Sequence, residues 1–184
     1  MSDYQTRPRH KEDMKYRMPL RTTDYVDVIA RATELGIRAP VGIALLPGNF
    51  QSAASAAELR YHEAAPRLRS GWRSIGLIDG GPSGTGPQPL APSASASVPL
   101  TVFFGAGLRS IPPRLITLAF GMIASVLTLR PGSAGSREIR LNAIVERPTG
   151  GYACLEFRGD AYELFLLAQA VRETWMDEQT IDRD

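Results

Sequence analysis

Cysteine and histidine are scarce in this chain of 184 residues, which holds one cysteine, Cys154, and two histidines, His10 and His62. A single thiol excludes a disulfide within the chain and a cysteine-based metal cluster, and it fits a reducing compartment. A cysteine nucleophile requires a nearby base, which so few histidines hardly supply. We therefore expect Cys154 to be a packed core thiol, and we predict no catalytic residue, metal site or cofactor.

Lysine is also nearly missing: of 21 basic residues, only Lys11 and Lys15 are lysines, and the others are arginines. One interpretation is anion recognition, because guanidinium groups bind phosphates and carboxylates bidentately. The chain is also rich in Ala, Gly and Pro, so we favour the second interpretation, the codon usage of a GC-rich bacterial genome. With a formal net charge of +2, the molecule as a whole has no strong field that would draw it to nucleic acid or membrane.

Long hydrophobic runs are absent. The first residues contain no apolar segment like that of a signal peptide, so we expect a cytoplasmic protein. The longest apolar stretch, Leu115–Leu129, has 15 residues between Arg114 and Arg130, fewer than the roughly 20 that a bilayer span requires. We predict a core helix here, with a protein interface and membrane contact as alternatives. The candidate interface residues are Ala119, Gly121, Met122 and Ala124.

Composition divides the chain into five parts. Residues 1–20 and 177–184 are polar and aperiodic and are predicted to be tails; the first is either a solvated arm or a basic arm for nucleic acid or an acidic partner. Residues 79–97 consist almost entirely of Gly, Pro, Ser and Ala and predict a mobile linker or surface loop. The linker separates a mainly helical region, 21–78, from an α+β region, 98–176. The predicted fold class is α+β.

The region before the linker predicts helices and one short strand. Thr22 or Thr23 is expected to cap a first helix whose apolar positions recur at helical spacing and which ends at Gly36. The run Val41–Leu46 predicts a buried strand. Two further helical pieces are expected within residues 52–76, the first starting at Ser52 or Ser55 and the second following Pro66. The apolar face of the first helix comprises Tyr25, Val28, Ile29, Ala32 and Leu35.

The region after the linker predicts a strand, a helix, a β-hairpin and a last helix. Leu100–Phe104 has the β-branched and aromatic content of a strand. Alternating polar and apolar residues from Ile139 to Glu146 predict a half-buried strand, which a turn at 148–151 joins to a partner at 152–158. Asp160 and Glu163 have the spacing of a capping box. The buried stripe of the last helix is predicted to be Leu164, Leu167, Ala168, Val171 and Trp175.

Three local patterns are candidate sites. The segment Gly81–Gly86 resembles the opening of a phosphate-binding loop, but Pro87 stands where the loop needs lysine, so we assign it to the linker. His62 and Glu63 are adjacent, and adjacent residues on a helix do not face each other, so they predict no dyad. An arginine-rich stretch with aromatic residues among the cations is a candidate nucleic-acid surface, although no recognised binding motif accompanies it. Its candidate residues are Arg60, Arg67, Arg69, Trp72 and Arg73, with Tyr61 beside them.

The order of elements over residues 100–176 resembles the effector-associated constant components, small accessory proteins of bacterial conflict systems of the anti-phage type. The resemblance lies in the apolar helix, the basic break at Arg130, the hairpin with its glycine-containing turn and the capped last helix. It implies a protein without catalytic residues. We accordingly predict a non-enzymatic accessory or regulatory subunit that acts by protein–protein interaction, with a nucleic-acid-associated protein as the alternative and an enzyme ranked third.

Overall fold

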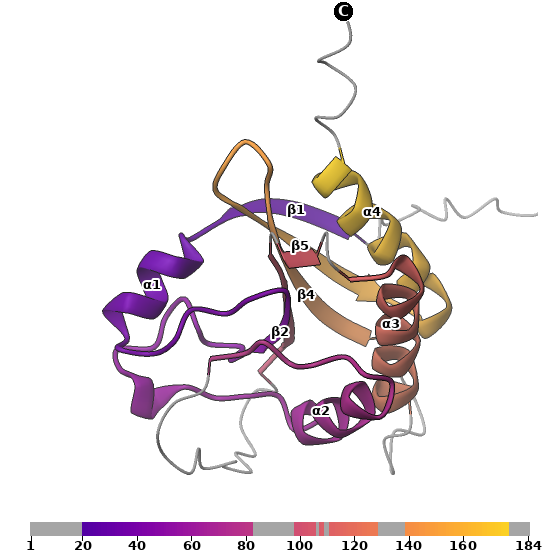
Figure 1. The fold of residues 1–184 in the computed structure, drawn as a ribbon, viewed down its shortest axis with the longest axis horizontal. Coiled ribbons are helices and arrows are strands. Elements are labelled where there is room, and N and C mark those ends of the chain that lie inside the picture. The colour runs from indigo at the N-terminus through magenta and orange to yellow at the C-terminus, as the bar shows by residue number, and fades with distance from the viewer. Residues whose placement is uncertain (1–19, 83–97, 106, 109–110, 129–138, 177–184) are drawn as a thin grey trace, which may run out of the picture.

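The computed structural model describes residues 20–82, 98–105, 107–108, 111–128 and 139–176. The fold is α+β, as predicted, and its helices pack on both faces of one mixed sheet (Figure 1). In chain order the elements are β1 (Leu20–Tyr25), α1 (Val28–Glu34), β2 (Ile43–Leu46), the 3-10 turn η1 (Ala56–Glu58), α2 (Ala65–Ser74), β3 (Leu100–Phe104), α3 (Pro113–Thr128), β4 (Ile139–Glu146), β5 (Tyr152–Gly159), the 3-10 turn η3 (Ala161–Glu163) and α4 (Leu164–Met176).

The sheet has the strand order β1-β5-β4-β3-β2. β3 and β4 are parallel and α3 connects them, whereas all other neighbouring strands are antiparallel. The two strands that precede the predicted linker, β1 and β2, form the opposite edges of the sheet, and the strands that follow it form the centre. The regions 21–78 and 98–176 therefore contribute to the same sheet.

The predicted start of the first helix is wrong. Residues 20–25 form β1, which pairs with β5 from Leu20 opposite Phe157 to Tyr25 opposite Tyr152. The helix begins at Val28, and its N-cap is Asp27, whose Oδ1 accepts hydrogen bonds from the backbone N–H groups of Ile29 and Ala30. The pairing of β1 with β5 therefore outweighs the helical spacing of the apolar residues, which predicted that Tyr25 belongs to the helix. The predicted end is confirmed: Gly36 has φ 65°, the left-handed conformation of a helix C′ position.

The prediction of a helix that starts at Ser52 or Ser55 is also wrong. Only the 3-10 turn η1, preceded by Ser55, forms between residues 52 and 62. Asn49 organises this segment, because its amide donates to the carbonyl of Glu58 and its Oδ1 accepts from the backbone N–H of Arg60. A side chain that satisfies the backbone in this way competes with a helical hydrogen-bond ladder. The second piece is confirmed as α2, with Pro66 in its first turn.

The first residues of the predicted linker are fixed in place. The backbone N–H of Gly80 donates to the carbonyl of Ile43, and the N–H of Val41 donates to the carbonyl of Gly80. The carboxylate of Asp79 accepts from the backbone N–H of Leu45 at 2.8 Å. Residues 79–81 therefore line the outer edge of β2. The rest of the predicted linker, residues 83–97, lies outside the described part of the chain, as do the predicted tail 177–184 and residues 1–19 of the predicted tail 1–20. Leu20, the last residue of that tail, belongs to β1 instead.

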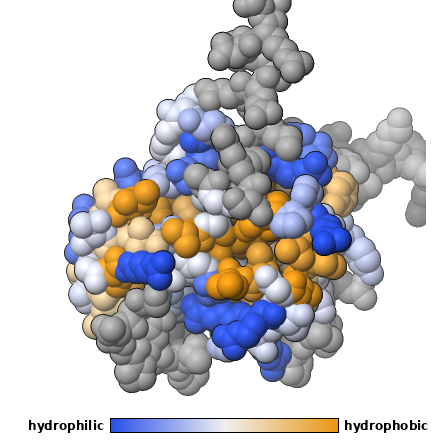
Figure 2. Space-filling model, in the orientation of Figure 1, coloured by the Kyte–Doolittle hydropathy of each residue, from blue (hydrophilic) through white to orange (hydrophobic). Residues whose placement is uncertain are grey.

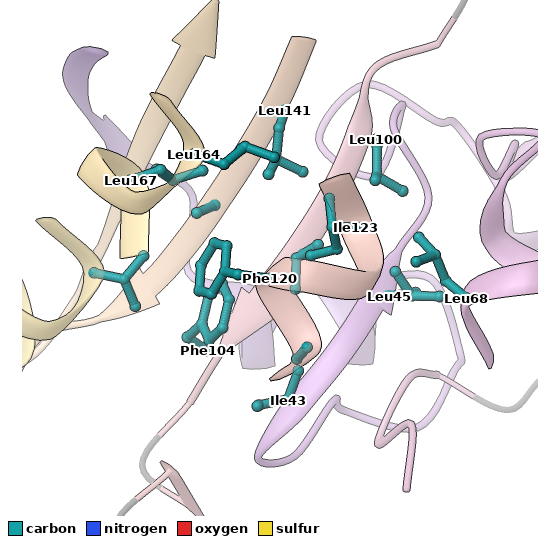
Figure 3. Close-up of a cluster of buried hydrophobic side chains, with 14 of the residues drawn as sticks. Ile43, Leu45, Leu68, Leu100, Phe104, Phe120, Ile123, Leu141, Leu164 and Leu167 are labelled. Atoms are coloured by element: carbon teal, nitrogen blue, oxygen red, sulfur yellow. The ribbon is translucent and has the colours of Figure 1, made fainter. Parts of the chain in front are cut away.

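Two hydrophobic layers enclose the sheet. The larger layer lies under α2, α3 and α4, where Phe104 stacks on Phe120 with ring centroids 5.5 Å apart (Figure 3). In the same view Leu164 and Leu167 of α4 lie against the strand that carries Leu141. The smaller layer lies on the other sheet face, beneath α1 and the segment from Phe50 to Leu59. Within the described ranges, one sheet face is thus covered by α2, α3 and α4, and the other by α1 and the segment from Phe50 to Leu59.

The elements predicted after the linker are confirmed. β4 and β5 form the hairpin, with Ile139 opposite Gly159 and Glu146 opposite Tyr152. The capping box of Asp160 and Glu163 is present, although it opens the 3-10 turn η3 rather than α4 directly. Of the predicted stripe on α4, Leu164, Leu167 and Val171 are buried and Ala168 is half-buried; the side chain of Trp175 lies outside the described part.

Candidate interaction surfaces

The arginine-rich stretch does not form the predicted aromatic and basic surface. Trp72 is 0% exposed and belongs to the core beneath α2, so its indole is not available to stack on a base. Arg69 is bound within the chain: its Nε donates to Oδ2 of Asp79 at 2.7 Å, and its guanidinium lies 4.5 Å from the ring centroid of Tyr61. Arg60 donates to backbone carbonyls of its own segment, those of Ala57 and Leu59.

Two of the predicted arginines, Arg67 and Arg73, are exposed on α2. The helix turns Trp72 inward and these two outward, since residues at successive positions lie about 100° apart around the axis. Residues that were predicted to form one surface therefore lie on opposite sides of the helix.

The other candidate groups show no catalytic arrangement. Cys154 is buried, as predicted, and burial together with the nearby Glu156 raises the pKa of its thiol from 9.0 to about 11, an effect that a hydrogen bond with Thr23 partly offsets. Such a thiol is largely protonated at neutral pH and is a poor nucleophile. His62 lies outside a helix, and its Nδ1 accepts a hydrogen bond from the backbone N–H of Ala64. Among the described residues, no group of His, Cys, Asp and Glu could hold a metal ion.

The apolar helix, α3, is a core helix on one side. Its buried residues are Ile116, Ala119, Phe120 and Ile123, all facing the sheet. Of the four predicted interface residues, Ala119 is therefore enclosed in the core of its own chain, and Met122 points toward α2, where its sulfur lies 3.2 Å from the position a Cβ would take on Gly71. Ala124 is half-buried, and only Gly121 is exposed. The predicted set thus spans three sides of the helix, and one of its members faces outward.

The outer side of α3 lacks charge. Beyond Arg114, no residue from Leu115 to Thr128 is charged, although the helix exposes a full face. The exposed positions of α2 and α4, by contrast, include arginines or a glutamate. Leu118, 49% exposed, is the large apolar residue of the α3 face, and the other exposed positions after Arg114 are small or hydroxyl-bearing: Thr117, Gly121, Ser125 and Thr128. We call these five residues the outer face of α3.

Two exposed aromatic residues belong to elements that pack beside α3. Tyr162 of η3 is 83% exposed and Phe165 at the start of α4 is 63% exposed. Both η3 and α4 contact α3. Phe165 follows the buried Leu164 directly, and this offset placed it outside the predicted stripe. The signal in the sequence is an aromatic residue off the buried face of an amphipathic helix.

Hydrophobic residues also reach the surface on the side of the molecule seen in Figure 2, where they form a band across the middle of the view. Val41 and Ile78 are among the exposed large hydrophobic residues of the chain.

No helix in the described ranges is long and apolar enough to cross a membrane. Comparison of the chain with models of known protein families, with curated proteins and with solved structures finds no match.

Proposed function

We propose that this protein is a non-enzymatic accessory subunit that binds another protein through the outer face of α3 together with Tyr162 and Phe165. The main support for this proposal is that α3 exposes an uncharged face, although 22% of the residues in the protein are charged. Cores of protein–protein interfaces are depleted of charged residues and enriched in aromatic ones. The outer face of α3 has the first property, and the two aromatic residues supply the second.

The outer face of α3 is open at Gly121. Gly121 has no atom within 4 Å of the position that a Cβ would occupy, so the backbone of α3 is accessible there. Aromatic side chains such as those of Phe165 and Tyr162 bury a large apolar area when a partner encloses them, and they contribute strongly to the energetics of interfaces. A partner that inserts an apolar side chain over Gly121 would cover Leu118 as well, since the two positions are three residues apart on the helix.

The resemblance over residues 100–176 supports the same proposal. Its elements, the strand, apolar helix, hairpin and capped helix, correspond to β3, α3, β4, β5 and α4. We propose a role in a bacterial conflict system on that basis, in the cytoplasm, with a protein partner from the same system. A second copy of the chain is the alternative occupant of the same face.

Site-specific photo-crosslinking in the native cell tests the proposal. A benzophenone amino acid at position 121 or 165 of the full chain should crosslink to one defined protein, whereas the same probe at Ser70, exposed on α2, should not. Leu118→Asp should abolish the crosslink from position 165 without unfolding the protein, as judged by circular dichroism. A crosslinked species with twice the mass of the chain would identify a second copy. Equal labelling from positions 121, 165 and 70 would refute the interface.

A further inference from the structure

The outer face of α3 lies in the middle of a layer of three helices. α3 packs between α2 and α4 on one face of the sheet (Figure 1). The hydroxyls of Thr117 and Thr128 donate to carbonyls of α3 itself, those of Pro113 and Ala124. These two side chains therefore need no polar partner, and the face offers a second chain apolar contact rather than hydrogen bonds.

Arginines border this face on α3 and α2. Arg114 precedes Leu118 by about one turn of α3, so the two side chains share a side of the helix. On α2, Gly71 lies against Met122 of α3. Arg67 is four residues before Gly71 and therefore lies on the side of α2 that adjoins α3.

α4 adds a third arginine. Arg172 follows Phe165 by seven residues, about two turns, which places the two side chains on one side of the helix. Arg67, Arg114 and Arg172 are all exposed, and within the described part of the chain none of the three forms an ion pair. Over the described positions of α2, α3 and α4, Glu173 is the one exposed acidic residue. The layer therefore presents an apolar centre with a basic border.

This distribution of charge disfavours a second copy of the chain on the face. Two copies packed through α3 would bring their bordering arginines together, and like charges at an interface repel. Glu173 supplies one carboxylate against three guanidiniums. In the whole chain, 19 acidic residues nearly balance 21 basic ones, so the excess of arginine is a property of this layer. A partner with carboxylates complements it.

An anionic membrane surface fits the face less well than a protein does. Amphipathic surfaces that enter the lipid interface bear large apolar side chains such as those of Trp, Phe and Leu. α3 exposes one such side chain, Leu118, and its other exposed positions after Arg114 are small or hydroxyl-bearing. Small side chains suit the packing of another helix, because the distance between two helix axes depends on the side chains at the contact.

The face also indicates the form of its partner. An extended peptide is bound through backbone hydrogen bonds at the edge of a sheet, whereas the backbone groups within a helix bond to each other. A partner that lies on α3 must therefore satisfy its own backbone, as an α-helix does. An amphipathic helix would place its apolar residues over Leu118, Gly121 and Phe165 and its polar flanks beside the arginines.

We propose that the partner of this face is an acidic amphipathic helix of another protein. Its apolar stripe packs on the outer face of α3 and on Phe165, and its Asp and Glu side chains pair with Arg67, Arg114 and Arg172. A guanidinium binds a carboxylate through two parallel hydrogen bonds, and charges at the border of an interface govern the association rate and the choice of partner. The inference rests on the proposed function, because it concerns the same face, and it adds the chemistry of the partner.

Photo-crosslinking from position 165 of the full chain in the native cell tests the inference when mass spectrometry sequences the attached peptide. The peptide should come from another protein, carry a net negative charge and have apolar residues at helical spacing. A neutral or basic peptide, or a peptide of a second copy of the chain, would overturn the inference but leave a protein interface at this face. The absence of a defined crosslink from both 121 and 165 would refute the proposed function itself.

A synthetic peptide with the sequence of the crosslinked segment measures what the arginines contribute. In stopped-flow fluorescence, Arg67→Gln/Arg172→Gln should lower the association rate constant about tenfold at low salt and much less at high salt, because salt screens the attraction. The matched control is Arg73→Gln/Arg158→Gln. It removes the same charge from exposed positions on another side of α2 and on the sheet face of the smaller layer and should leave the rate within about twofold.

Two results of these measurements would overturn the inference. Equal losses in the two double variants would show a general effect of net charge rather than pairing at the border of α3. Sedimentation of the full chain with phosphatidylglycerol vesicles covers the lipid alternative. Binding to the vesicles that Arg67→Gln/Arg172→Gln abolishes, and that displaces the peptide, would show that an anionic membrane occupies the face instead.

Discussion

Asp79 and Arg69 form an ion pair of 2.7 Å that joins α2 to the edge of the sheet. The same carboxylate accepts hydrogen bonds from the backbone N–H groups of Leu45 in β2 and of Gly81. One side chain thus binds a helix, a strand and the segment that lines the strand. An edge strand whose backbone groups are satisfied in this way is protected from pairing with another chain.

Replacement of Asp79 by Ala should lower the free energy of unfolding by about 1–3 kcal/mol, because it leaves two backbone donors and a guanidinium without their acceptor. Urea denaturation measures the change. The matched control is Glu34→Ala, which removes another arginine–carboxylate pair, that with Arg31, at a more exposed site; it should cost less than about 0.5 kcal/mol. Similar losses in the two variants would contradict the role assigned to Asp79.

Leu167 on α4 is fully buried in the larger core layer. Leu167→Ala should destabilise the protein by roughly 2–5 kcal/mol, through lost burial and the cavity that remains. Phe165→Ala, two residues away and exposed, should change the stability of the isolated chain by less than about 0.5 kcal/mol. A thermal denaturation series that ranks the two variants in the opposite order would show that α4 packs through another face.

Gly121→Ala should stabilise the isolated protein by about 0.5–1 kcal/mol, because alanine is the better residue in a helix interior and the site is open. Gly36→Ala is the comparison, since that position is also open but has φ 65°. There the added Cβ is strained, and the variant should be less stable than the unmodified chain. Destabilisation by Gly121→Ala, measured in urea, would mean that the outer face of α3 is already covered.

Stability should fall at alkaline pH. Burial is the main cause that raises the pKa of Cys154 from 9.0 to about 11 and that of Tyr152 from 10.0 to about 12, and it raises the pKa of Tyr25 as well. The folded protein therefore holds these protons more tightly than the unfolded chain, so their contribution is complete below pH 9 and is lost as the pH rises through about 11 to 12.

Urea denaturation at successive pH values checks this dependence. Cys154→Ala should remove the part of the loss that begins near pH 9, the ordinary value for the thiol, and leave the part that begins near pH 10, the ordinary value for tyrosine. A free energy of unfolding that stays constant across this range in the unmodified protein would show that the three side chains are solvated.

The sequence by itself determined the α+β class and most elements after the linker. The alternation from Ile139 to Glu146 and the capping box at Asp160 are local signals, and local hydrogen bonds and a single buried face are sufficient to impose them. The end of α1 at Gly36 is also a local signal, because it depends only on the backbone conformation of that residue. The burial of Cys154 was predicted from the sequence because so few histidines are present to activate its thiol.

Tertiary structure decided what depends on residues distant in the chain. Leu20–Tyr25 is a strand because β5, more than a hundred residues later, offers it a pairing edge, and no local pattern contains that information. Trp72 does not belong to the predicted surface because α2 packs this side chain on the sheet. Arg69 does not belong to it because Asp79 supplies a counter-ion. Arg140 and Arg158 became neighbours only through the register of the hairpin. In each case the free energy comes from contacts that form only when the sheet assembles, so the order of residues along the chain does not reveal it.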